Sequence, residues 1–84
     1  MTWFVYMLRC RGGSLYTGIT TDLRRRVAAH RAGRGGRYTR SHLPVRLVYR
    51  ERRATRGAAL KREAAIKRMS PTAKRRLVRP SEPG

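Results

Sequence analysis

Glu63 is one of only four acidic residues in a chain of 84 residues that carries 22 lysines and arginines. It lies four residues after Ala59 and three before Ile66, a spacing that places it on or beside the apolar face of a helix. A carboxylate there could hold Mg²⁺, which commonly keeps several waters and shares the phosphate oxygens of a substrate. The alternative is an ion pair with Lys67, one helical turn later, and the spacing alone favours that alternative.

Arg26 and His30 are the second pair of candidates for chemistry. With Leu23 and Val27 they occupy positions i, i+3, i+4 and i+7 of an expected helix, so all four share one face. The two polar side chains would therefore flank an apolar stripe close to a sheet. For Arg26 the alternative is an aliphatic stem packed on the sheet with its head in water. For His30 the alternative is a half-buried histidine at the end of a helix.

Tyr6 and Tyr16 lie in two strand-like segments separated by the turn sequence Arg11-Gly12-Gly13-Ser14, which together predict a β-hairpin. A two-residue loop centred on Gly12-Gly13 would place the two tyrosine rings on opposite faces of the hairpin. A loop with an odd number of residues, or one bulge, places them on the same face. Shared chemistry of the two tyrosines therefore predicts an odd loop.

The charge of the chain indicates what these residues act on. The formal net charge is +18 and the pI is near 12.0, which predicts a polyanionic partner, either nucleic acid or an anionic membrane surface. The basic residues are 19 arginines and three lysines, and arginine matches phosphate oxygens two at a time. A coding bias towards arginine is the alternative explanation of that ratio. Membrane binding is the least favoured, because neither main helix pairs a clean apolar face with large anchors.

Several other classes of protein are not expected. The longest apolar run, from Trp3 to Leu8, is much shorter than the ~20 residues of a membrane span. No secretory signal is visible, and the single cysteine, Cys10, cannot form an intramolecular disulfide, so we expect a cytoplasmic protein. His30 and His42 are twelve residues apart with no cysteine nearby, which does not match the spacing of a zinc site.

The elements that position these residues form the order ββαβαα, an α/β (α+β) fold with a small three-stranded antiparallel sheet and flanking helices. The run from Trp3 to Leu8 predicts a central strand covered on both faces. We expect one domain over residues 1–79 and a disordered tail over residues 80–84. The other expected elements are a strand over 15–19, a helix over 22–31, a mobile basic loop over 31–43, a strand from Pro44 in which Val45, Leu47 and Tyr49 share a face, a helix from about Thr55, and a short helix over about 72–78.

The ordered set of residues resembles the GIY-YIG nuclease superfamily. Phe4-Val5-Tyr6, followed ten residues after Tyr6 by Tyr16-Thr17-Gly18, resembles its paired signature, although the first triplet begins with Phe and the second contains Thr17. Asp22-Leu23-Arg24-Arg25-Arg26 resembles the stretch that ends in the invariant arginine of the family. His30 matches a position that is His or Tyr in many members. Leu60-Lys61-Arg62-Glu63 resembles the helix with the metal-binding glutamate, and the similarity spans Trp3 to Val78, as in the small stand-alone bacterial members.

The resemblance implies a specific role for each residue. One Mg²⁺ or Mn²⁺ ion would bind Glu63 and polarise the scissile phosphate. Arg26 would stabilise the charge that develops on the phosphoryl oxygens. Tyr16, or alternatively His30, would take the proton of the attacking water, and Tyr6 would help to orient that water. Gly18 would let the backbone run close to the substrate or to the first helix.

The leading hypothesis is therefore a metal-dependent DNA endonuclease in DNA repair or recombination. It would recognise structure rather than sequence, because no element that could read base edges is visible. The alternatives are a catalytically weak or inactive nucleic-acid-binding module on the same fold, and a small RNA-associated basic protein. Cleavage of RNA and the oligomeric state stay open. The residues predicted to contact nucleic acid are Arg24, Arg25, Arg34, Arg37, Tyr38, Arg40 and Lys67.

Overall fold

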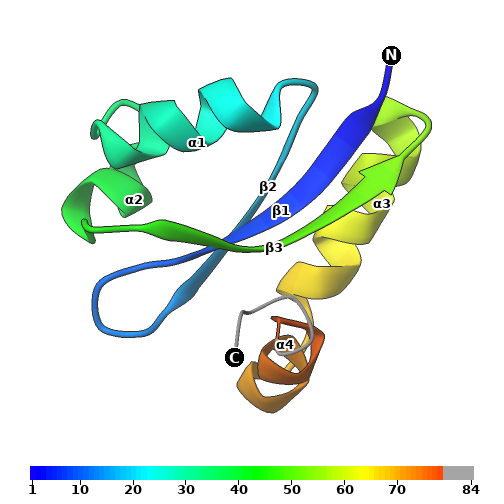
Figure 1. Ribbon diagram of the computed structural model, residues 1–84. Helices are drawn as coiled ribbons and strands as arrows, with labels where there is room; N and C mark the ends of the chain where they lie inside the picture. The colour runs from blue at the N-terminus through cyan, green and yellow to red at the C-terminus, as the bar shows by residue number, and fades with distance from the viewer. Residues whose placement is uncertain (79–84) are drawn as a thin grey trace.

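The central strand, β1 (Trp3–Arg9), carries the core of the protein, whose computed structural model describes residues 1–78. It pairs with β2 (Leu15–Thr20) on one side and with β3 (Arg46–Arg53) on the other, and both pairings are antiparallel. The four consecutive residues from Val5 to Leu8 are all buried. The prediction of a central strand covered on both faces is therefore confirmed (Figure 1).

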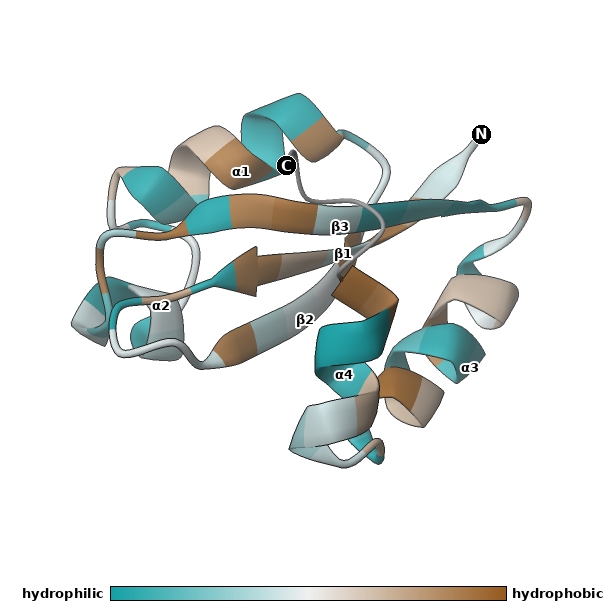
Figure 2. Cartoon of the chain, turned by 60° about the horizontal axis from the view of Figure 1, so that its bottom comes forward, coloured by the Kyte–Doolittle hydropathy of each residue, from teal (hydrophilic) through white to brown (hydrophobic). Residues whose placement is uncertain are grey.

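Four helices cover the sheet, in the predicted order with one short addition. They are α1 (Leu23–Arg31), α2 (Arg37–Ser41), α3 (Arg56–Lys67) and α4 (Pro71–Val78). Figures 1 and 2 show α1 over one face of the sheet and α3 and α4 over the other. The apolar residues of the strands form one cluster on each face, as the alternation of side chains along a strand requires.

The starts of the three longer helices follow from side-chain caps. In each case an oxygen of the residue before the helix accepts a hydrogen bond of 3.1 Å from the backbone N–H three residues later. These caps are Asp22, Thr55 and Ser70. Pro71 then occupies the first helical position, where its missing N–H costs nothing. The expected starts at about residues 22, 55 and 72 lie within one residue of the observed ones.

The prediction of a mobile basic loop over residues 31–43 is wrong in the middle of that segment, where five residues form α2. Tertiary contacts hold this short helix. Thr39 is completely buried, and the hydroxyl of Tyr38 donates a hydrogen bond of 2.7 Å to the Ser14 hydroxyl in the hairpin loop. The glycine- and arginine-rich composition predicts local flexibility, and it carries no information about such distant partners.

The predicted odd hairpin loop is confirmed. Leu8 is paired with Tyr16 and Tyr6 with Gly18, while the last pair before the loop is Arg9 with Leu15. The connecting residues are therefore 10–14, an odd number. Tyr16 lies two residues from the partner of Tyr6, so the two tyrosines project from the same face of the sheet.

The predicted alternation along β3 is wrong beyond Leu47. Leu47 pairs with Leu8 and Tyr49 pairs with Met7, so Val48 is an extra residue that has no partner in β1. This bulge shifts the alternation by one position. As a result Val48 and Tyr49 both pack in the cluster under α3 and α4, whereas Val45 and Leu47 pack in the cluster under α1.

Two further expectations concern the membrane and the C-terminal end of the chain. Within residues 1–78, no helix has the length and apolarity to cross a membrane. The predicted disordered tail over 80–84 lies outside the described residues, as does Arg79 at the end of the predicted domain.

Candidate active site

The Tyr6 phenol and the His30 imidazole form a buried hydrogen bond between β1 and α1. The Tyr6 hydroxyl lies 2.9 Å from His30 Nε2, and both side chains are almost fully buried. His30 Nδ1 lies 2.8 Å from the hydroxyl of Thr39 in α2, and that hydroxyl donates to the Gly36 carbonyl at 3.4 Å. Because the Thr39 hydrogen is directed to Gly36, the His30 Nδ1–H donates to Thr39. His30 Nε2 can then accept the hydrogen bond that the Tyr6 hydroxyl donates.

Tyr16 adds an aromatic ring to this pair. Its ring centroid lies 6.4 Å from that of Tyr6 and 5.2 Å from that of His30. On its other side, Tyr16 lies nearly parallel to Tyr38 at 6.4 Å, and Tyr38 stacks on His42 at 4.1 Å. Tyr16 is half-buried whereas Tyr6 is 1% exposed. Of the two predicted tyrosines, Tyr16 is therefore the one within reach of solvent.

Two glycines make room for the Tyr6–His30 pair. A Cβ atom at Gly18 would lie 2.6 Å from the Tyr6 hydroxyl oxygen, and a Cβ atom at Gly35 would overlap the His30 ring. The close neighbour of Gly18 is thus Tyr6 across the hairpin and not the first helix, while the alternative that Gly18 lets the backbone approach the substrate stays a prediction. The reason is that Tyr6 and Gly18 are directly paired, which turns the tyrosine ring over the glycine.

Arg26 fastens the loop that covers His30. Its guanidinium donates a hydrogen bond of 2.9 Å to the Gly35 carbonyl. The side chain is half-buried and lines a pocket of about 550 Å³ together with Arg25 and Arg34. One N–H of the guanidinium therefore holds the loop at Gly35, and the rest of the group borders a basic pocket that is open to solvent.

The surroundings of the pair keep both groups neutral at neutral pH. Burial raises the pKa of Tyr6, the Arg26 guanidinium opposes that effect, and the negative charge of Glu63 adds to it. Burial lowers the pKa of His30, and the charge of Arg26 lowers it further. The charge of Glu63, on α3, is the smallest of these influences on the Tyr6 pKa.

Glu63 has the ion pair that its spacing allows, with Lys67 Nζ at 3.5 Å. Its side chain is 19% exposed, whereas the lysine is 56% exposed, so this partner lies largely in water. The other two acids within residues 1–78 have protein partners. Asp22 caps α1, and Glu51 accepts hydrogen bonds from Tyr49 and Arg62. Glu63 is therefore the described acid best placed to bind a cation.

The donor set around Glu63 fits a single hard divalent cation. Among the described residues, no group of three or more His, Cys, Asp or Glu side chains is placed to hold a metal. Mg²⁺ bound by one carboxylate completes its shell with waters and the phosphate oxygens of a substrate. The residues present therefore fit a metal that binds together with a phosphodiester.

The residues predicted to contact nucleic acid do not form one group. Arg25 and Arg34 border the Arg26 pocket, Tyr38 stacks against Tyr16, and Lys67 pairs with Glu63. The remaining three lie elsewhere. Arg24 faces the other flank of α1, and Arg37 and Arg40 are exposed on α2.

Two residues of the site were missed by the sequence analysis. Thr39 fixes the proton position on His30, and Gly35 lets the backbone cross that ring. No spacing rule connects either residue to His30. The only available signal was the concentration of glycines around position 35, which indicates close approach of the backbone.

Comparison with known proteins bears on this arrangement directly. Residues 2–76 match the family model described as the GIY-YIG catalytic domain. The chain belongs to the GIY-YIG family. The similarity to this family inferred from the tyrosine, arginine and glutamate positions is thereby confirmed, and the family is a nuclease domain family.

The relatives of this GIY-YIG chain include small UPF0213 proteins. The UPF0213 protein DP2720 of Desulfotalea psychrophila is 57% identical over 98% of this chain and 76% of its own length. The UPF0213 protein H16_B0156 of Cupriavidus necator is 52% identical over 87% of this chain and 79% of its own length. The solution structure of the UPF0213 protein BH0048 from Bacillus halodurans is similar with a TM-score of 0.60 and 41% identity, covering 93% of this chain and 83% of that one.

Membership of the GIY-YIG family assigns a nuclease role in general and a nucleic-acid substrate. Nucleases of this family generally use a divalent metal, in agreement with the donor set at Glu63. The confirmed fold, a three-stranded antiparallel sheet with helices, agrees with a second solution structure, that of EF2693 from E. faecalis, with a TM-score of 0.64 and 36% identity over 94% of this chain and 84% of that one.

A methyl group at Gly35 should disrupt the buried pair. The Gly35→Ala variant is expected to lose about 1–3 kcal/mol of unfolding free energy, because the His30 ring has no space to move into. Gly57→Ala is the matched control, since a Cβ atom there meets nothing within 4 Å and the residue lies in α3. That control should be unchanged or more stable by up to about 1 kcal/mol. Urea unfolding of both variants measures the difference, and equal stability would contradict the close approach at Gly35.

Acid should destabilise the fold through His30. Because the folded-state pKa of His30 is lowered, the unfolded chain takes up the proton first as the pH falls below about 6.5. The unfolding free energy is therefore expected to decrease from about pH 7 to about pH 5. Urea unfolding across this range should show the decrease in the wild type and in His42→Gln. It should be reduced in His30→Gln, and an equal decrease in all three proteins would exclude His30 as its source.

Proposed function

We propose that this GIY-YIG domain is a divalent-metal-dependent DNA endonuclease. The supporting observation is the meeting of Tyr6, Tyr16 and His30 in one aromatic group, with Arg26 bonded to the loop that crosses the His30 ring. These four residues come from β1, β2 and α1. A purely structural RNA-associated protein has no need to gather two tyrosines, a histidine and a half-buried arginine in this way.

Arg26 is the residue proposed to stabilise the transition state. Its bond to the Gly35 carbonyl holds the guanidinium in place before substrate arrives. The remaining N–H groups can then donate to phosphoryl oxygens, and a fixed donor costs no reorganisation as charge develops there. Arg26 should therefore matter to the rate of cleavage more than to the affinity for DNA.

Tyr16 is proposed to take the proton of the attacking water. His30 is fully buried, and both of its ring nitrogens have protein partners, so it cannot contact that water directly. It acts instead through Tyr6. Because His30 accepts the hydrogen bond of the Tyr6 hydroxyl, the lone pairs of the Tyr6 oxygen stay free to accept a hydrogen bond from Tyr16.

Glu63 is proposed to hold one Mg²⁺ or Mn²⁺ ion. The ion, when bound, would act as a Lewis acid toward the scissile phosphate. The exposed Lys67 ammonium partly neutralises the Glu63 carboxylate. Because the lysine side chain is flexible and lies largely in water, it can move away from the carboxylate when a metal ion binds. A single-carboxylate site also agrees with the scarcity of acids in the chain, because a two-metal site needs several converging carboxylates.

The proposed substrate is a DNA structure rather than a sequence, as in repair or recombination. The exposed arginines supply affinity for phosphates, which carries no sequence information. A cytoplasmic location is proposed as well, because Cys10 is a free, buried thiol that suits a reducing compartment.

One observation favours a second candidate function, a nucleic-acid-binding module on the same fold that does not cut. The Lys67 ammonium lies 3.5 Å from Glu63 Oε2, where it competes with a cation for the carboxylate. Such a module would bind DNA or RNA with the same charge of +18 and would need no divalent metal.

Removing either charged catalytic group should separate cutting from binding. Glu63→Gln and Arg26→Ala are each expected to lower the rate of Mg²⁺-dependent cleavage about 100-fold or more, as the loss of one transition-state contact does elsewhere. Their affinity for DNA should stay within about threefold of the wild type. Arg68→Ala is the control, because it removes one exposed arginine at the end of α3. Gel assays of cleavage and anisotropy measurements of binding provide the two readouts.

Equal cleavage by the wild type and both variants would identify a contaminating nuclease and would refute the proposal. Equal binding without cleavage by any of the four proteins, with either Mg²⁺ or Mn²⁺, would favour the non-cutting module.

Structural selectivity is tested separately by varying the DNA. Linear, nicked, flapped and four-way substrates of the same sequence should be cut at different rates, with branched or flapped DNA cut at least about tenfold faster than the plain duplex. The reason is that contacts to phosphates distinguish shapes and not bases. Uniform rates on all four substrates would count against a structure-selective enzyme.

A further inference from the structure

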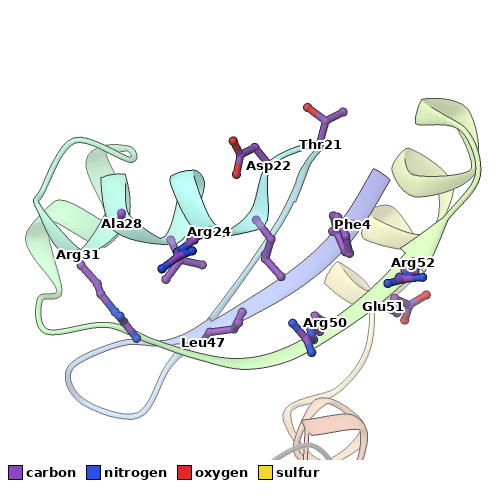
Figure 3. Close-up of a pocket in the computed structure, with 12 residues that line it drawn as sticks. Phe4, Thr21, Asp22, Arg24, Ala28, Arg31, Leu47, Arg50, Glu51 and Arg52 are labelled. Carbon is purple, nitrogen blue, oxygen red and sulfur yellow. The ribbon is translucent and has the colours of Figure 1, made fainter. Parts of the chain in front are cut away.

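A large pocket lies on the other flank of α1 from His30. It is an open groove of about 1010 Å³ between α1 and the strands β1 and β3 (Figure 3). Its floor is apolar, formed by Phe4, Leu23, Val27 and Leu47. This groove is separate from the aromatic group of Tyr6, Tyr16 and His30, none of which lines it.

Four arginines surround that apolar floor. Arg24 and Arg31 project from α1, and Arg50 and Arg52 come from β3 (Figure 3). All four are exposed. Within residues 1–78, none of these guanidinium groups has an ion pair with a carboxylate. Like charges that gather without neutralising partners repel one another, so the groove is complementary to an anion.

The two acids that border the groove do not neutralise it. Asp22 lies at the rim and accepts a hydrogen bond from the first turn of α1. The carboxylate of Glu51 is held by the Tyr49 hydroxyl and by Arg62 of α3. Both carboxylates are thus engaged elsewhere in the fold.

The bulge at Val48 is what brings two of the arginines to this side. In a strand that alternated strictly through Val48, Arg50 and Arg52 would share the face of Val48, which α3 covers. With it, they are paired with Tyr6 and Phe4 of β1 and share the face of the sheet that α1 covers. The groove is therefore built by an irregularity in the sheet, and the sequence pattern of β3 did not predict it.

We propose that this groove binds a single strand of nucleic acid, with phosphates on the four arginines and a base against the apolar floor. Guanidinium groups match phosphate oxygens, and an apolar and aromatic floor accepts any base without reading its sequence. The volume is at the upper end of the usual range for small-ligand sites, about 300–1,000 Å³, which suits nucleotides of one strand. This inference rests on the proposed function for the class of ligand, and it adds a strand-binding site beside the cutting site.

The test measures binding alone, in the presence of EDTA, so that no cleavage is required. Fluorescence anisotropy follows a labelled oligothymidylate of about 10 nucleotides and a blunt duplex of the same length. The groove variant is Arg50→Gln with Arg52→Gln. The matched control is Arg75→Gln with Arg76→Gln, which removes the same charge from the exposed surface of α4 on the other face of the sheet. All four positions are exposed, so both variants should fold.

The groove variant is expected to bind the single strand about tenfold more weakly than the control variant does. The slope of log affinity against log salt concentration should fall by about 1.4, since each lost phosphate contact of a single strand contributes about 0.7. An abasic strand of the same length should bind the wild type at least about fivefold more weakly, because it cannot cover the apolar floor.

If both double variants bound the single strand equally weakly, the inference would be overturned, because the groove arginines would then contribute no more than any other exposed positive charges. Binding of an acidic peptide as tight as that of the oligonucleotide would assign the groove to a protein partner and would overturn it as well. A failure of the proposed nuclease activity is distinguishable from both outcomes. It would appear as unchanged cleavage in Glu63→Gln, which leaves the metal-free binding result untouched.

Discussion

The hydrogen bond between Tyr6 and His30 is the interaction on which the arrangement of the site depends. It joins the central strand to α1 in the interior, and Thr39 of α2 continues it. A buried imidazole left without partners costs free energy, so these three elements are held in one relative position. The same bond requires glycine at two places where the chain crosses the pair. Core and site are therefore the same residues in this small domain, and one cannot change without the other.

The sequence was sufficient wherever a local rule applied. Helices were expected from about residues 22, 55 and 72, close to where they begin, and the parity of the hairpin loop followed from the requirement that two tyrosines share a face. It was insufficient wherever a contact joined distant segments. Thr39 meets His30 across nine residues of glycine-rich chain, and nothing in the composition of that segment indicates the meeting. Glu63 was identified by its position on α3, but its influence on Tyr6 exists only in the folded chain.

The three acids within residues 1–78 each have a defined partner. Asp22 serves a helix terminus, Glu51 joins β3 to α3, and Glu63 meets Lys67 at the border of the site. The arginines are far more numerous than these partners, so most of the positive charge faces solvent. That excess opposes folding by self-repulsion, and a bound polyanion relieves it. Binding of nucleic acid should accordingly stabilise the folded chain, as any ligand of the native state does.

The extra residue in β3 decides which charged side chains lie on each face of the sheet. Beyond Val48, odd and even positions exchange faces, so one set of side chains, Tyr49, Glu51 and Arg53, joins the helix-covered interior while the intervening arginines meet the groove. Deleting Val48 would remove the bulge and leave Tyr49, Glu51 and Arg53 on one face and Arg50 and Arg52 on the other, because the pairs that follow Leu47 would stay the same. The faces that the later side chains occupy thus depend on where the register shift lies along β3.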